Sequence, residues 1–140
     1  MLTEVQKSQY VTTVFIIPKK EGTVRFITEY RRLNHQLVRK PYTSPRIGET
    51  VQQLEGFQYM TELDPNMGYY TIRISPASQD TTIVTEVGKF RYNRLPMGMC
   101  NSGDIFQGKV DNLLGGIKGV KNYINDVLIL GKDRFENHTE

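Results

Sequence analysis

The chain is 140 residues long, which suits a single domain with a buried core, although hydrophobic residues make up only 38% of it. It contains no apolar run long enough to cross a membrane, and the polar, mixed residues 1–10 exclude a secretory signal. Cys100 is its one cysteine, which excludes an internal disulfide and is typical of a reducing compartment. We therefore expect an intracellular protein without membrane association.

Charge is distributed unevenly along the chain, and this says more than the net value of +3. Residues 1–46 carry nine Lys or Arg against three Asp or Glu, which is +6, whereas the remainder carries nine against twelve, which is −3. The basic front could hold a polyanion such as a nucleic-acid backbone or a triphosphate, and the acidic back could hold a metal cation. A solvated basic surface with no ligand explains the same numbers.

The first part of the chain predicts a hairpin, a basic irregular segment and a helix. Residues 11–17 are β-branched and aromatic and predict a strand. Residues 18–22 form a turn whose glycine can adopt a positive φ, and residues 23–28 pair back on the first strand. Residues 31–40 are basic and irregular, and a helix follows over residues 44–56, from a Ser-Pro start to a glycine stop.

The second part predicts alternating strands and helices with short turns between them. We expect a strand over 57–63 that ends at Asp64, a turn over 65–68, a strand over 69–74 and a short helical start over 75–78. Strands over 81–87 and 90–94 then flank Gly88–Lys89, and a helix runs from Ser102 to Leu114. Strands over 120–124 and 127–130 follow around an Asn125–Asp126 turn, and a last helix begins at Asp133. Helices segregated against an antiparallel sheet make this an α+β fold.

Two carboxylates stand at the ends of apolar strands. Asp64 ends one strand, and Asp126 lies in the turn between two others. A rigid strand end is where metal chemistry needs a carboxylate, and Mg²⁺ prefers a few carboxylates together with substrate phosphate oxygens. Read by themselves, the two residues are more typical of ordinary turn aspartates.

Several short strings occur in one order and spacing that resemble a known family. They are Pro18-Lys19-Lys20-Glu21-Gly22-Thr23-Val24-Arg25-Phe26, Tyr30-Arg31-Arg32-Leu33-Asn34, Leu63-Asp64-Pro65-Asn66-Met67-Gly68-Tyr69-Tyr70, Arg94-Leu95-Pro96-Met97-Gly98-Met99, Phe106-Gln107 and Tyr123-Ile124-Asn125-Asp126. From about Val11 onward, the chain resembles the reverse transcriptase of Gypsy-type long-terminal-repeat retrotransposons. The resemblance implies one domain over residues 1–140, with fingers at about 10–56 and palm at about 57–140, interleaved with fingers near 75–95.

The resemblance also implies roles for individual residues. Asp64 and Asp126 match metal-binding aspartates that hold two Mg²⁺ ions in the family, and Asn125 stands where the family has a third. Lys19, Arg25, Gly68, Tyr69 and Met97 match nucleotide-binding positions, and Arg31 and Gly98 match template-contacting positions. Each has a plainer alternative: Lys19, Arg25 and Arg31 as solvated charges, and Tyr69 and Met97 as core residues.

The departures from the family pattern predict impairment. Asn125 is uncharged, so two carboxylates remain for two divalent ions. Glu29 replaces an aspartate, residues 10–13 replace a Trp/Ala/Pro-type entry to the first strand, and the chain stops at Glu140 before the thumb and RNase H. The implied partners are an RNA or DNA template-primer and deoxynucleoside triphosphates, in the cytoplasm, the nucleus or virus-like particles.

Two other readings stay open at this point. One is a non-catalytic nucleic-acid-binding remnant of a retroelement that uses its basic residues alone. The other is a translated relic of a transposon with no function. Oligomeric state is not fixed by any of these patterns.

Overall fold

The computed structural model describes residues 1–8, 10–43, 56–79, 82–85 and 87–131. The chain divides into two compact units. The basic unit comprises Met1–Arg39 and Tyr69–Ser102, with eleven Lys or Arg against five Asp or Glu, or +6. The acidic unit comprises Lys40–Gly68 and Gly103–Glu140, with seven against ten, or −3. The helices predicted over 44–56 and from Asp133 lie outside the described residues, and no described helix is long and apolar enough to span a membrane.

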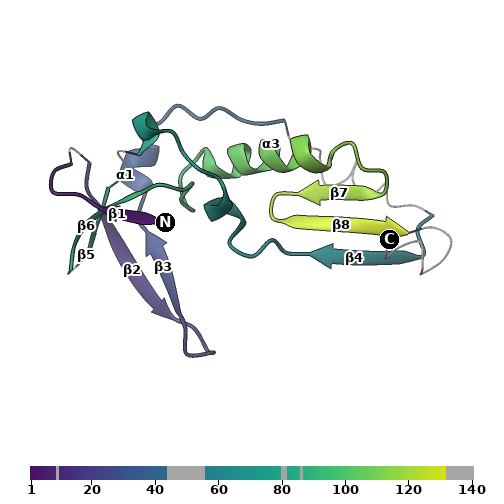
Figure 1. The fold of residues 1–140 in the computed structure, drawn as a ribbon, viewed down its shortest axis with the longest axis horizontal. Coiled ribbons are helices and arrows are strands. Elements are labelled where there is room, and N and C mark those ends of the chain that lie inside the picture. The colour runs from purple at the N-terminus through teal and green to yellow at the C-terminus, as the bar shows by residue number, and fades with distance from the viewer. Residues whose placement is uncertain (9, 44–55, 80–81, 86, 132–140) are drawn as a thin grey trace. The chain divides into compact units, whose positions relative to one another are not determined.

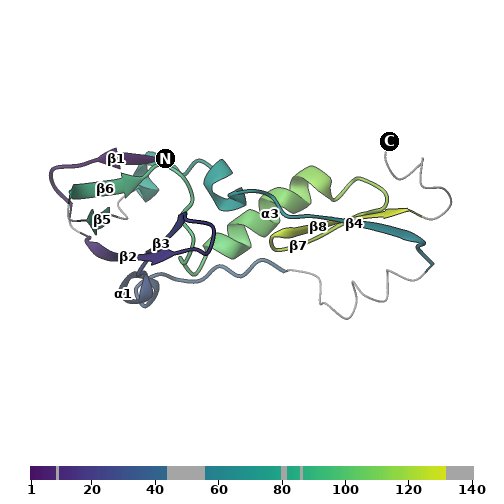
Figure 2. The same ribbon diagram turned by 90° about the horizontal axis from the view of Figure 1, so that it is seen from below.

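A five-stranded sheet forms the frame of the basic unit (Figures 1 and 2). Its strands, in the order β1-β6-β5-β2-β3, are β1 (Leu2–Glu4), β6 (Gly88–Tyr92), β5 (Thr82–Thr85), β2 (Thr12–Pro18) and β3 (Val24–Thr28). Neighbouring strands are antiparallel except β2 and β5, which are parallel. Short helical turns connect them: α1 (Arg31–Asn34), η1 (Gly68–Thr71) and η2 (Pro76–Ser78). The short helical start predicted at 75–78 is confirmed.

The β2–β3 hairpin confirms the first sequence prediction. Its pairing runs from Val14 with Thr28 to Pro18 with Val24. The Lys19 N–H then donates to the Thr23 carbonyl at 2.8 Å, which closes the loop. Gly22 has φ +77°, a conformation that a side chain would disfavour, so glycine is needed at that point. Two lysines and a glutamate thus lie at the tip of a regular hairpin.

Three buried residues form the core of the basic unit. Tyr30, Ile83 and Tyr92 are 2%, 0% and 1% exposed. The Tyr92 hydroxyl is hydrogen-bonded to the Thr28 hydroxyl at 2.9 Å, and its ring stacks on Tyr70 with the centroids 6.2 Å apart. Burial raises the pKa of Tyr92 to about 12, because the phenolate would lose its hydration there.

The acidic unit contains a three-stranded antiparallel sheet with helix α3 (Ser102–Leu114) running along it in both views (Figures 1 and 2). The strand order is β4-β8-β7, with β4 at Tyr59–Leu63, β8 at Asp126–Gly131 and β7 at Val120–Tyr123. Phe106 of α3 and Val127 of β8 are 4% and 8% exposed, so both the helix and the sheet contribute apolar side chains that are buried. The helix ends before Gly115, as predicted.

The α+β fold class is confirmed, while several local predictions are wrong. Residues 69–74 are not a strand: η1 occupies their start, and only an isolated bridge joins Arg73 to Arg94. The basic segment after Tyr30 begins with one helical turn, α1. Leu2–Glu4, for which the sequence predicted no element, is strand β1, because it pairs with β6.

Both predicted tight turns are displaced along the chain. The β5–β6 pairing closes between Thr85 and Gly88, so the connection precedes the predicted Gly88–Lys89. The β7–β8 pairing closes between Tyr123 and Asp126, so the two turn residues are Ile124 and Asn125. Asp126 is therefore the first residue of β8 and has the rigid support of a strand.

The raised pKa of Tyr92 predicts how the basic unit responds to alkali. Between pH 10 and 12 the unfolded chain loses the phenol proton of this tyrosine, while the folded state retains it. The free energy of unfolding is therefore unaffected below pH 10 and falls as the pH rises towards 12. Tyr92→Phe should reduce this dependence of the free energy of unfolding on pH. It should also lower the free energy of unfolding at pH 8 by about 1–2 kcal/mol, because the Thr28 hydroxyl loses its hydrogen-bond partner. Urea unfolding between pH 8 and 12 measures both effects. Tyr10→Phe, at an exposed position, is the matched control, and equal pH slopes in all three proteins would contradict the prediction.

Candidate active site

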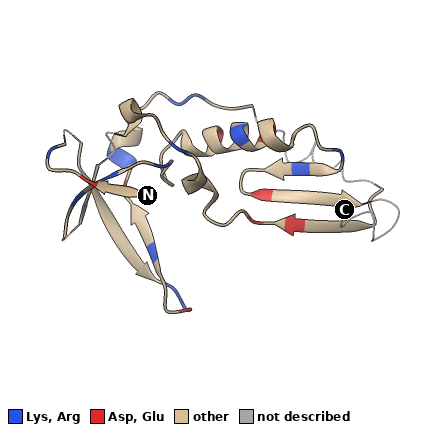
Figure 3. Cartoon of the chain, in the orientation of Figure 1, with Lys and Arg blue, Asp and Glu red and all other residues tan. Residues whose placement is uncertain are grey.

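Asp64 and Asp126 lie at the same end of two neighbouring strands. Leu63 at the end of β4 pairs with Val127 of β8, and the next residues in the antiparallel register are Asp64 and Asp126. Asp64 and Asp126 therefore lie immediately beyond the last pair of this register, at one end of the sheet. Both carboxylates are exposed, and Figure 3 shows acidic residues at the end of β4 and the start of β8. The structure therefore brings together the two aspartates that were singled out from sequence.

A strained turn precedes Asp126. Ile124 has φ +54°, which is unfavourable for a β-branched residue, and Asn125 follows it. The Ile124 N–H donates to Oε1 of Gln107, a side chain of α3 that is only 2% exposed. The helix thus holds the turn in a conformation that the local sequence disfavours.

The donors around this turn suit a divalent cation, with one ligand weakened. Carboxylate oxygens on adjacent strands are the ligands that Mg²⁺ uses together with substrate phosphates. The amide of Asn125 offers a neutral oxygen where a third carboxylate would add charge. Among the described residues, no three His, Cys, Asp or Glu side chains form a group that could hold a metal ion. Asp64 and Asp126 are the residues that fit the role.

Gly68 lies in η1, where the chain leaves this site. A Cβ built on it would come within 2.7 Å of Cζ of Phe106, so the position requires glycine for close packing. Its N–H donates to the Pro65 carbonyl at 3.1 Å, which closes the turn after Asp64. This packing accounts for the glycine, and its approach to a nucleotide stays a prediction.

A cavity in the basic unit gathers three other predicted residues. It has a volume of about 190 Å³ and is lined by Arg25, Phe26, Ile27, Thr28, Tyr70, Met97 and Gly98. Arg25 and Met97 are exposed at its rim, and Gly98 has φ +94°. A cation beside an open apolar wall can bind a phosphate while a base or sugar packs on the wall.

Asn34 holds the loop beside this cavity. Its Nδ2 donates to the Gly98 carbonyl, and its Oδ1 accepts the Cys100 N–H, both at 2.9 Å. One amide side chain therefore fixes the backbone on both sides of Met99. Asn34 was part of a motif string and was assigned no role from sequence, because its partners lie more than 60 residues away.

The remaining predicted residues of the basic unit lie apart from that cavity lining. Lys19 is exposed at the tip of the β2–β3 hairpin. The Arg31 guanidinium pairs with the Glu29 carboxylate at 2.6 Å, and this pairing lowers the pKa of Glu29 and raises that of Arg31. Tyr69 is half-buried, and burial raises the pKa of its phenol.

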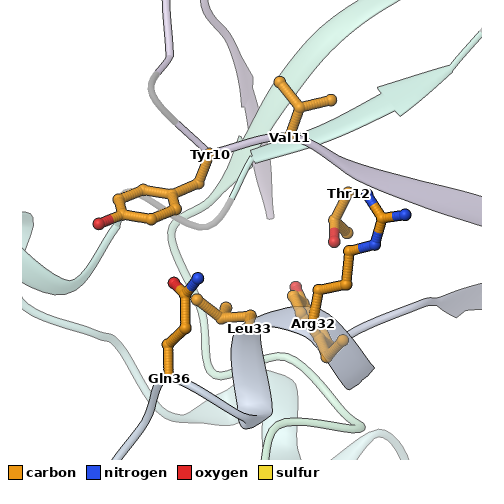
Figure 4. A pocket seen from close by; sticks show the side chains of 7 residues that line it. Tyr10, Val11, Thr12, Arg32, Leu33 and Gln36 are labelled. Carbon is orange, nitrogen blue, oxygen red and sulfur yellow. The ribbon is translucent and has the colours of Figure 1, made fainter.

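A second cavity of the basic unit lies beside α1 (Figure 4). It has a volume of about 80 Å³ and is lined by Tyr10, Val11, Thr12, Tyr30, Arg32, Leu33 and Gln36. Arg32 on α1 and Gln36 just after it extend towards the segment that enters β2. None of the residues predicted to bind nucleotide, template or metal lines it.

Comparison with known proteins places the chain among retroelement sequences. Residues 17–140 match the family described as "Reverse transcriptase (RNA-dependent DNA polymerase)". The chain is 28% identical to the Pol polyprotein of transposon 412 and 30% identical to that of transposon opus, both from Drosophila melanogaster. The matches cover 99% and 94% of this chain, but only 12% and 14% of those polyproteins. The transposon Tf2-3 polyprotein of Schizosaccharomyces pombe is 30% identical over 89% of the chain and 10% of its own length.

Solved structures give the same assignment of fold. The prototype foamy virus protease–reverse transcriptase matches with a TM-score of 0.87 and 27% identity, over 99% of this chain and 18% of that one. A foamy viral protease–reverse transcriptase in complex with an RNA/DNA hybrid matches with a TM-score of 0.76 at 23% identity, over 99% and 18% of the two chains. These likenesses agree with the α+β architecture.

The packing of Gly68 yields a stability prediction. Gly68→Ala should lower the free energy of unfolding by about 1–3 kcal/mol, because the added methyl would overlap the buried ring of Phe106. Gly116→Ala is the matched control, since a Cβ there meets nothing within 4 Å. Urea denaturation of both variants measures the difference. Equal effects would contradict the prediction, because they would show that the Phe106 ring can move aside without loss of stability.

Proposed function

The chain belongs to the reverse transcriptase family, and on that premise we propose that it supplies the metal-binding residues for nucleotidyl transfer to a primer 3′ hydroxyl. The observation that carries this proposal is the β4–β8 register, which puts Asp64 beside Asp126. We propose further that the substrates are deoxynucleoside triphosphates on an RNA or DNA template-primer, and that the element is of the Gypsy type. Localisation within the cell or in virus-like particles stays a prediction.

The chain's own residues would divide the work between binding and orientation. Asp64 and Asp126 would hold the metal ions, and Arg25 and Lys19 would bind the polyphosphate. Bound divalent ions would activate the 3′ hydroxyl and neutralise the leaving pyrophosphate. Tyr69 and Met97 would pack against sugar and base, and Gly98 and Arg31 would contact the template.

Asn125 sets the expected level of activity. An amide oxygen can ligate a cation, but it supplies none of the negative charge of a carboxylate. Stabilisation by such ions is worth several kcal/mol, and each 1.4 kcal/mol is tenfold in rate, so we expect the loss to be at least about three decades. The chain is therefore proposed to be an impaired polymerase domain.

Restoring the carboxylate tests this expectation. Asn125→Asp, in a chain that continues through the thumb, should raise single-nucleotide primer extension with Mg²⁺ by about a thousandfold or more. Asp64→Asn in the same background should abolish the gain, because it removes the carboxylate beside Asp126. If the native and Asn125→Asp chains extend the primer equally, Asn125 is not the cause of impairment.

A second candidate function is nucleic-acid binding without catalysis. The net charge of +6 on the basic unit favours it, with the exposed cations Arg25 and Lys19 on the β2–β3 hairpin (Figure 3). Binding of this kind depends on counterion release, so it weakens as salt rises and does not need the missing carboxylate.

Salt dependence distinguishes this function from an inert relic. The plot of log affinity against log salt for a fluorescent template-primer should be linear, and Arg25→Ala should reduce its slope by about 0.7–0.9, the share of one phosphate contact. Lys118→Ala, an exposed cation of the acidic unit, should leave the slope unchanged. Fluorescence anisotropy in KCl measures it. An affinity that does not vary with salt would argue against both nucleic-acid functions.

A further inference from the structure

A chain of polar contacts leads from Tyr42 through Asp111 and Gln107 to the Ile124–Asn125 turn. The Ile124 N–H donates to Oε1 of Gln107, and Nε2 of Gln107 donates to Oδ1 of Asp111 at 3.1 Å, one helical turn further along α3. The hydroxyl of Tyr42 interacts with the Asp111 carboxylate, which raises the pKa of Tyr42. All these residues belong to the acidic unit.

Asp111 decides which end of the Gln107 amide faces the turn. An amide side chain has an acceptor at one end and two donors at the other, and its two orientations have nearly the same shape. The Asp111 carboxylate only accepts, so it takes the NH₂ group and leaves the oxygen for Ile124. With the amide reversed, two donors would face each other at Ile124, and the strained turn would lose the contact that holds it.

Tyr42 is itself fixed to α3 at two further points. Its N–H donates to Oδ1 of Asp104 at 3.0 Å. A Cβ built on Gly108 would come within 3.2 and 3.3 Å of the Tyr42 ring, so the ring lies against bare helix backbone. Asp104, Gly108 and Asp111 are spaced four and three residues apart and therefore share one face of the helix. These contacts with α3 hold Tyr42 so that its hydroxyl lies near Asp111.

From this geometry we infer that Tyr42 and Asp111 are positioning residues for the turn that carries Asn125 and Asp126. They act through Gln107 and touch no reacting atom. Their effect on metal binding rests on the proposed function, whereas their effect on the turn does not. The two effects are therefore measured separately.

Hydrogen exchange of the Ile124 amide in the ¹⁵N-labelled 140-residue chain tests the positioning directly. Asp111→Leu has a similar branched shape, favours the helix more than Asp does and removes the acceptor, so a rise of about tenfold in Ile124 exchange cannot come from a weakened helix. Tyr42→Phe keeps the ring on Gly108 and the backbone bond to Asp104, and should raise exchange by about threefold. Asp111→Asn, which retains an acceptor oxygen, should recover most of the protection lost in Asp111→Leu.

Matched controls separate positioning from general stability. Lys109→Gln removes a charge at an exposed position of the same helix, outside these contacts, and should leave Ile124 exchange unchanged. In a Gln107→Leu background, Tyr42→Phe should add nothing, because the link to the turn is already cut. Unaltered Ile124 exchange in both Tyr42→Phe and Asp111→Leu would overturn the inference. So would a further rise caused by Tyr42→Phe in the Gln107→Leu background.

Titration with Mn²⁺ gives the second readout. Asp111→Leu should weaken Mn²⁺ affinity by about threefold or more, because Asp126 follows the loosened turn. If the native chain binds no Mn²⁺, the proposed function fails, while the exchange data still decide the positioning role. If Mn²⁺ binds equally to native chain and variant while exchange rises, the turn is positioned by Asp111 and its effect on the metal is refuted.

Discussion

The antiparallel register between β4 and β8 determines which residues of the acidic unit can share a cation. Leu63 opposite Val127 puts the two following aspartates side by side, and side chains alternate faces along a strand. A slip of one residue would turn one aspartate to the opposite face of the sheet. The register is maintained by apolar side chains such as Val127 and Leu130, each 8% exposed, so packing of the core sets the geometry of the polar site.

Helix α3 supports that register with three different kinds of contact. The ring of Phe106 fills the space that Gly68 leaves open, which fixes the turn after Asp64. The amide of Gln107 reaches the turn before Asp126. The bare backbone at Gly108 seats Tyr42. Asp64 and Asp126 are therefore each next to a turn that contacts α3. A change in the position of the helix would alter both turns.

The sequence predicts what local pattern can encode. The β2–β3 hairpin, α3 and the two aspartates follow from residue type and spacing. Strand β1 does not, because Leu2–Glu4 has no periodic pattern and is ordered by pairing with β6, about 90 residues away. The β7–β8 turn was predicted one residue late, because Asn-Asp is a common turn pair and Ile with a positive φ is not. The hydrogen bond from the Ile124 N–H to Gln107, 17 residues earlier, explains that choice, and a local sequence pattern does not reveal such a contact.

Asparagine at position 125 fits its turn as well as aspartate would, since both residues are common in turns. We therefore expect the exchange to have little effect on the fold. Asparagine and aspartate codons differ by one base. A single base change would therefore place a carboxylate at position 125 within the same turn.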